Sequence, residues 1–159
     1  DATSYRVVPT GVFSVTYDLM NNGVAVARLE HRVLSMRDEA AITVPGRTWV
    51  ARRERVMRAS AVLAAADGTT RATAERETYW RENYRVAFGD RGLRLRQQVF
   101  SWRGRFTVED CGGEVGFIEL ERPFTRRLVA SFGAEGPPVE IVAFLAWIVL
   151  VVYRRRAAD

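Results

Sequence analysis

Short segments in which apolar and polar residues alternate fill the chain as far as Phe132. The alternation is clearest at Leu93 to Arg96 and at Arg105 to Glu109. A period of two is typical of a β-strand with one face in the core and the other in water. We predict twelve strands over about residues 5–132: Tyr5 to Pro9, Val12 to Asp18, Val24 to Glu30, Ala40 to Val44, Thr48 to Arg53, Ser60 to Ala65, Arg71 to Glu77, Tyr84 to Phe88, Gly92 to Val99, Arg103 to Glu109, Glu114 to Glu121 and Arg126 to Phe132.

Turn-forming residues separate these segments at intervals of about ten residues, a spacing that predicts an all-β sandwich or barrel. Asn, Asp and Gly tolerate the positive φ of tight hairpins. An antiparallel meander is the simplest topology for such a chain. Residues 52–66 have a composition that also suits a helix, but the Asp67-Gly68 turn favours strands there. The turn signals are Asn21-Asn22-Gly23, Pro45-Gly46, Asp67-Gly68, Gly89 to Gly92 and Asp110 to Gly113.

The last part of the chain has a different pattern, because thirteen consecutive residues from Ile141 to Tyr153 are apolar or aromatic. Pro138 suits the first turn of a helix, where its missing N–H costs nothing. Glu140 near the start and Arg154 to Arg156 near the end complement the helix dipole. We therefore predict a helix over about residues 138–154.

This helix is too short to cross a membrane, because thirteen residues reach only about 20 Å and the hydrocarbon layer is about 30 Å thick. A helix that is apolar on every side must be buried on every side. The twelve strands can close into an antiparallel β-barrel around it. We expect one mainly β domain over residues 1–159, whose central helix places Phe144, Leu145, Trp147 and Leu150 in the core.

Composition and motifs make an enzyme the least supported class of function. All 24 basic side chains are Arg, and the net charge is +5. Without Lys there is neither Schiff-base chemistry nor a nucleotide P-loop. His31 and Cys111 are the only residues of their kinds and lie in no catalytic motif, so we expect a surface histidine after a strand and a turn cysteine. We predict no catalytic residue, no metal site and no cofactor.

Clusters of Arg are the feature that indicates a partner. Nearby aromatic residues such as Trp49 and Trp102 would help Arg to hold phosphates of lipid headgroups or of nucleic acid. The alternative is a solvated surface, because a chain without Lys must use Arg at every basic position. We favour an anionic phospholipid surface over nucleic acid. The candidate contacts are Arg52, Arg53, Arg103, Arg105, Arg126 and Arg127.

Several short motifs occur in an order that resembles a known family. They are Ala72 to Arg76 after the Asp67-Gly68 turn, Gly104-Arg105-Phe106, Gly113 to Ile118, Phe124 to Arg127, and Phe144 to Trp147 leading to Arg154-Arg155. Together they span roughly the C-terminal two-thirds of the chain. With the terminal apolar helix, they resemble the tubby C-terminal-like superfamily, and specifically a bacterial member of its LURP-one-related family.

The resemblance implies a twelve-stranded barrel that encloses a hydrophobic C-terminal helix. Relatives in this superfamily include phosphoinositide-binding tubby proteins and phospholipid scramblases. The tubby lipid site uses Lys, which this chain lacks, and the cysteine-rich segment of the scramblases is also absent. The resemblance therefore implies a fold more than a function.

Three functions stay open at this point. The first is a non-enzymatic binding domain that contacts anionic phospholipid headgroups through surface Arg. The second is a structural or protein-interaction domain with an unknown protein partner and no lipid role. The third, a single-pass protein anchored by residues 139–153, conflicts with the length of the helix. Residues Asp1 to Gly11 contain no signal-like apolar stretch, so we expect a cytoplasmic protein, peripheral at the membrane if it binds lipid.

Overall fold

The computed structural model describes residues 2–11, 15–32, 38–55, 59–78, 80–134 and 136–158 of the chain. Within them lie twelve β-strands followed by one α-helix. In chain order they are β1 (Thr3–Pro9), β2 (Thr16–Asn21), β3 (Val24–His31), β4 (Glu39–Val44), β5 (Arg47–Arg55), β6 (Ala59–Ala65), β7 (Thr70–Arg76), β8 (Asn83–Phe88), β9 (Arg91–Gln97), β10 (Phe106–Asp110), β11 (Gly113–Leu120), β12 (Leu128–Phe132) and α1 (Val139–Ala158).

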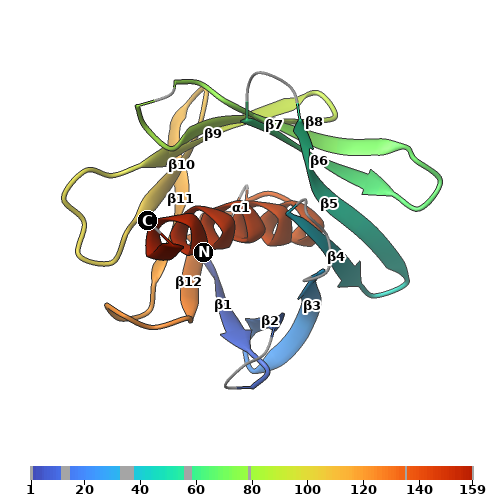
Figure 1. Cartoon of the computed structure of the whole chain (residues 1–159), viewed down its shortest axis with the longest axis horizontal. Coiled ribbons are helices and arrows are strands. Elements are labelled where there is room, and N and C mark those ends of the chain that lie inside the picture. Colours follow the sequence, from blue (N-terminus) through green and yellow to red (C-terminus); the bar gives the residue numbers. More distant parts are fainter. Residues whose placement is uncertain are drawn as a thin grey trace.

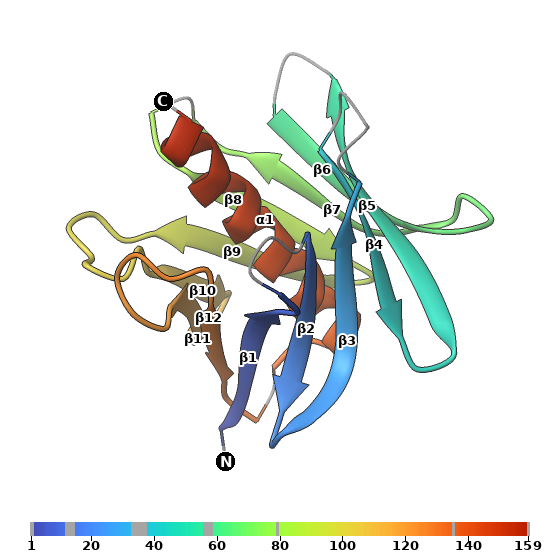
Figure 2. The same ribbon diagram turned by 60° about the horizontal axis from the view of Figure 1, so that its bottom comes forward.

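The strands form one closed antiparallel barrel. Each strand pairs with the next strand in the sequence, and β12 returns to pair with β1, where Ala130 lies opposite Tyr5. Figure 1 shows α1 in the middle with the strands arranged around it, and Figure 2 shows the same arrangement from another side. The predicted fold class, a closed antiparallel barrel that encloses the C-terminal helix, is confirmed.

The inside of the barrel is filled by α1. Every residue from Ile141 to Val152 is at most 8% exposed, so this part of the helix is buried on all sides. The rings of Phe144 and Trp147 stack with their centroids 6.0 Å apart. The strands face the helix with every second residue, as at Leu93 and Leu95 in β9, while Arg94 between them points outward. The helix and the inner faces of the strands therefore form one hydrophobic core.

Small side chains on the wall let the helix come close. α1 packs most closely on β3, β4 and β5. Ala27, Ala40 and Ala51 point inward from these strands and are at most 5% exposed. Because the inward side chains of these strands are small, the helix lies close to the strands. The larger side chains of the helix then fill the remaining space inside the barrel.

Polar contacts hold α1 at both ends. At its start, the Pro138 carbonyl accepts hydrogen bonds from the backbone N–H groups of Ile141 and Val142, both at 3.0 Å. The Glu140 carboxylate accepts a hydrogen bond of 3.2 Å from Arg71 in β7. At the other end, Arg154 lies 3.5 Å from the carboxylate of Asp38, which precedes β4.

The observed strands agree with the predicted set, although some bounds differ. The predicted strands that end at Val99 and begin at Arg103 and Arg126 are each shorter in the structure. The reason is local, because Phe100, Gly104 and Phe124 have positive φ and interrupt the extended backbone.

Three further sequence predictions concern segment bounds. Residues 12–14 of the predicted strand Val12 to Asp18 lie outside the described residues, and β2 begins at Thr16. The helix continues past the predicted end to Ala158, so Arg154 to Arg156 lie inside it. The ambiguous 52–66 segment contributes the end of β5 and all of β6, as predicted, while residues 56–58 lie outside the described residues. In the described part of the chain, no helix is long and apolar enough to cross a membrane.

We predict that Leu145→Asp abolishes cooperative unfolding. Leu145 is fully buried, and an unpaired carboxylate in an apolar core costs several kcal/mol, comparable to the whole stability of a typical domain. Leu145→Met is the matched control, because a swap of similar volume usually costs less than about 1.5 kcal/mol. Urea unfolding followed by circular dichroism measures both. A cooperative transition in Leu145→Asp with an unchanged midpoint would contradict the buried position of this helix.

A second prediction concerns Gly116 in β11. A Cβ at this position would lie 2.3 Å from the backbone oxygen of Ser131 and 2.4 Å from the Phe132 ring. Gly116→Ala should therefore lower the free energy of unfolding by about 1 to 3 kcal/mol. Gly92→Ala should change it by no more than about 0.5 kcal/mol, because the nearest atom would be 3.9 Å away. Equal denaturation midpoints for the two variants would show that the β11–β12 contact is looser than described.

Candidate functional site

The two ends of the barrel are built differently. At one end the strands are joined by short turns, such as 22–23, 45–46 and 89–90. At the other end lie the longer connections 98–105 and 121–127, the described residues of 77–82, and the C-terminal turn of α1. We call this second end the loop end. Its position follows from the meander, because antiparallel strands place alternate connections at opposite ends of the barrel.

Four large aromatic side chains are almost fully exposed at the loop end. Trp80, Phe100, Trp102 and Phe124 are 91–105% exposed, and they come from three different connections. At the short-turn end, the exposed large apolar side chain in the described part of the chain is Val24, at 62%. Single exposed apolar residues are normal on proteins, but a group of aromatic side chains at one end indicates a contact surface.

Two of these aromatic residues also have an unusual backbone. Phe100 has φ of 67° and Phe124 has φ of 62°. A bulky residue in the left-handed region costs free energy, of the order of 1 to 3 kcal/mol. Both rings remain in water at this cost, so the folded domain gains no packing from them. Strained positions of this kind concentrate at functional sites.

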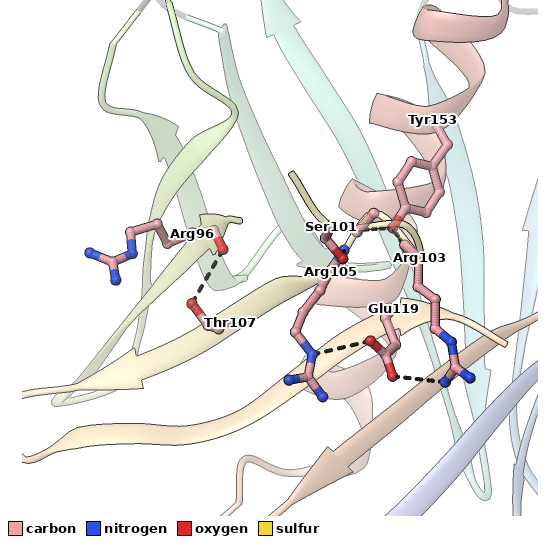
Figure 3. A network of polar contacts seen from close by, with 8 residues as sticks. Arg96, Ser101, Arg103, Arg105, Thr107, Glu119 and Tyr153 are labelled. Atoms are coloured by element: carbon pink, nitrogen blue, oxygen red, sulfur yellow. Dashed lines mark hydrogen bonds and ion pairs between the residues drawn. The ribbon is translucent and has the colours of Figure 1, made fainter. Parts of the chain in front are cut away.

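Three of the six predicted arginine contacts are paired with carboxylates. Arg53 bonds to Asp38 at 2.9 Å. Arg103 and Arg105 converge on Glu119 from either side, at 3.4 Å and 3.1 Å, as Figure 3 shows. One carboxylate shared by two guanidinium groups leaves this cluster with a net positive charge.

The other three predicted contacts differ in their surroundings. Arg126 donates a hydrogen bond of 3.2 Å to the Tyr17 hydroxyl and lies 5.6 Å from the centre of that ring. Arg52 and Arg127 are exposed, and among the described residues neither has a carboxylate partner. The structure brings Arg103, Arg105, Arg126 and Arg127 to the loop end. Arg53 also lies at this end, because its partner Asp38 contacts Arg154 in the last turns of α1.

Tyr153 connects the end of α1 to the 98–105 connection. Its hydroxyl donates a hydrogen bond to the Gly104 carbonyl, and its ring meets Phe106 edge-on with centroids 6.1 Å apart. Figure 3 shows Tyr153 pointing from the helix toward this connection. A Cβ at Gly104 would lie 2.8 Å from the tyrosine hydroxyl, and Gly104 has φ of 58°. Burial raises the pKa of Tyr153, so the hydroxyl stays protonated and can donate.

A pocket of about 570 Å³ opens at the loop end between the 121–127 connection and the last turns of α1. Apolar side chains supply most of its wall, and arginine side chains lie among them. Its volume falls within the usual range for small-molecule sites. The described lining residues are Val15, Tyr17, His31, Trp102, Leu120, Pro123, Phe124, Thr125, Arg126, Leu150, Tyr153, Arg154, Arg156 and Ala157.

His31 lies in this pocket, which corrects the sequence prediction of a surface residue after the strand. The residue is only 7% exposed, because β3 continues through His31 and its alternation places Leu29 and His31 on the inner face. Its ring meets Tyr17 edge-on, and its buried Nδ1 has no hydrogen-bond partner. The pKa of the imidazole is lowered to about 4, mainly by burial and also by the nearby Arg154, while Asp38 opposes the shift. His31 is therefore neutral at pH 7.

The other chemically distinctive residue, Cys111, is exposed in the turn between β10 and β11, far along the chain from His31. Among the described residues, no group of three or more His, Cys, Asp or Glu is arranged to hold a metal ion. Comparisons of the chain with protein-family models, with curated proteins and with solved structures each found no match.

Sequence reasoning missed most of the aromatic surface and the whole pocket. It named Trp102 beside the arginine clusters but did not assign Phe100, Phe124 or Trp80 to a contact surface. A signal was present, since Phe100 and Phe124 stand in segments with Arg and without strand alternation. The pocket had no comparable signal, because its wall combines residues from β2, β3, β11 and α1.

We predict that His31 makes the domain sensitive to acid. Its folded pKa of about 4 is below the unfolded value of 6.5, so the unfolded chain binds the proton more readily. This contribution to stability is present above about pH 6.5 and is lost as the pH falls toward 4. The loss relative to pH 7.5 should be about 3 kcal/mol at pH 4. His31→Phe should lack this component, because phenylalanine does not titrate.

Urea unfolding of both proteins at pH 7.5 and pH 4 tests this. The titration of the carboxylates affects both proteins equally, so it cancels when the loss of unfolding free energy in His31→Phe is subtracted from the loss in wild type. The same loss of stability in wild type and His31→Phe would show that His31 is not the responsible group.

Proposed function

We propose that the chain is a non-enzymatic binding domain whose loop end docks on an anionic phospholipid surface. The observation that carries this proposal is the group of exposed aromatic side chains at the loop end, Trp80, Phe100, Trp102 and Phe124. Tryptophan favours the boundary between water and lipid, because there its ring leaves water while its N–H still finds a hydrogen-bond partner. Phenylalanine has no polar group that would be left unpaired.

Arginines around the aromatic group supply the attraction to anionic headgroups. In the 98–105 and 121–127 connections the acidic residue is Glu121, which already pairs with Arg6. In the 77–82 connection, Glu77 pairs with Arg94 and Glu82 with Arg76. The basic residues of the 98–105 and 121–127 connections, together with Arg154 to Arg156 of α1, therefore leave the loop end positive. A basic residue near an anionic membrane surface contributes roughly 1 kcal/mol, and the contribution falls with salt.

The strained backbone at Phe100 and Phe124 supports the same proposal. Insertion of these rings into the headgroup region would supply the apolar contact that they lack in the isolated domain. A cytoplasmic protein held peripherally at a membrane fits this mode of binding. The alternative, a protein-interaction domain, would use the same surface.

We further propose that the domain is a bacterial LURP-one-related member of the tubby C-terminal-like superfamily. The support is the architecture, since the resemblance implies a twelve-stranded barrel around an apolar C-terminal helix, and the chain has this fold. Lipid binding through the loop end is argued from the exposed residues themselves, and the lysine-containing lipid site of tubby proteins has no part in it.

Cosedimentation with vesicles tests the proposed function. Wild type should bind vesicles of phosphatidylcholine with phosphatidylglycerol, bind vesicles of phosphatidylcholine alone much more weakly, and dissociate as salt is added. Phe100→Asn should weaken binding roughly tenfold, since a buried aromatic side chain contributes about 1.5 kcal/mol or more. Asn tolerates the positive φ at this position, so the connection should keep its shape. Val24→Asn, at the short-turn end, is the matched control.

A charge series completes the test. Arg127→Gln combined with Arg156→Gln should weaken binding by roughly twentyfold to thirtyfold, about 1 kcal/mol for each charge. Arg28→Gln combined with Arg85→Gln removes the same charge from the outer wall of the barrel and should have little effect. If wild type ignores phosphatidylglycerol vesicles at low salt, the lipid proposal fails and the protein-interaction alternative replaces it.

A further inference from the structure

We infer that the pocket at the loop end binds one fatty carboxylate, with its alkyl chain between the 121–127 connection and α1 and its carboxylate at the arginines. This goes beyond docking on a membrane surface, because the ligand is a single dissolved amphiphile. The pocket has a mainly apolar wall, and three arginines, Arg126, Arg154 and Arg156, form a positive rim around it.

The apolar wall can hold an alkyl chain. Leu120 and Pro123 face the pocket from the end of β11 and the following connection, and Leu150 faces it from α1. The available volume is about 570 Å³. Pro123, Phe124 and Ala157 of this wall are exposed to water, and such apolar surface gains free energy when an apolar ligand covers it.

The charges select an anionic head. Among the described residues that line the pocket, Arg126, Arg154 and Arg156 are basic and none is acidic. Arg154 forms an ion pair with Asp38 at 3.5 Å, and Arg126 donates a hydrogen bond to the Tyr17 hydroxyl. Arg156 is exposed and has no carboxylate partner among the described residues, so its planar guanidinium can form paired hydrogen bonds with a carboxylate.

The inner part of the pocket also contains an unused polar group. The His31 side chain is nine-tenths buried there, and its Nδ1 has no partner. Buried polar atoms in folded proteins nearly always have partners. The His31 Nδ1 is itself closed off from solvent, so it belongs to the buried wall of the pocket, and the arginines recognise the carboxylate. The ring is neutral at pH 7, so the positive charge at the rim comes from the arginines alone.

Isothermal titration calorimetry with dodecanoate tests the inference on the full chain. Wild type should bind one equivalent, and decanoate should bind more weakly, by up to about fourfold for each buried methylene that is lost. Dodecyltrimethylammonium, which has the opposite charge, and acetate, which has no chain, should not bind measurably. Equal affinity for dodecanoate and dodecyltrimethylammonium would overturn the role of the arginines.

Variants that fill the pocket with a larger side chain give the decisive test. Ala157→Trp and Val15→Trp add bulk on two different walls, and each should weaken dodecanoate binding at least tenfold. Ala66→Trp and Val24→Trp add the same bulk at exposed positions of the short-turn end and should bind dodecanoate as wild type does. Circular dichroism melts confirm that each variant is folded. Unchanged affinity in both filling variants, with folded protein, would overturn the inference.

Failure of this inference can be separated from failure of vesicle docking. Phe100 does not line the pocket, so Phe100→Asn should weaken vesicle binding and leave dodecanoate binding within about twofold of wild type. Dodecanoate binding by a protein that ignores vesicles would support the pocket and refute the docking surface. Vesicle binding without saturable dodecanoate binding would support docking and refute the fatty carboxylate.

Discussion

Burial of α1 inside the barrel is the constraint on which the rest of the structure depends. A ring of twelve strands encloses more space than its own inward side chains would fill, and a helix that is apolar all round cannot remain in water. Each element therefore satisfies the requirement of the other. The inner faces of the strands are mainly apolar because of this, and the inward side chains of Ala27, Ala40 and Ala51 are small where the helix approaches most closely.

The enclosed helix also makes the two ends of the barrel different. It begins beside the short turns, where its first turn is bonded to Pro138 and Arg71, and it ends among the long connections. There Tyr153 holds the 98–105 connection and Arg154 reaches Asp38. The helix terminus thus carries positive charge to the same end at which the aromatic side chains are exposed. A partner for this domain is most simply placed there.

Position in the fold separates the arginines that pair within the domain from those that can meet a ligand. Arg28 in β3 and Arg96 in β9 lie on strands and pair with carboxylates of the neighbouring strands β2 and β10. Exposed pairs of this kind contribute little to stability, but they do neutralise the wall of the barrel. Arg127 and Arg156 stand where the strand ladder ends and where such partners are fewer. The uneven distribution of charge is therefore a consequence of strand pairing as well as of composition.

The sequence by itself determined the fold class, because both of its signals are local. The alternation at Leu93 to Arg96 sets the inner and outer faces of a strand, and the unbroken apolar run from Ile141 to Tyr153 requires enclosure. Tertiary structure decided the site. Whether His31 is buried depends on the continuation of β3 and on the ring of Tyr17, and the pocket exists only where four elements meet. Positive φ at Phe100 and Phe124, which sets the exposed rings, likewise arises from how the chain must turn between strands already fixed in a closed barrel.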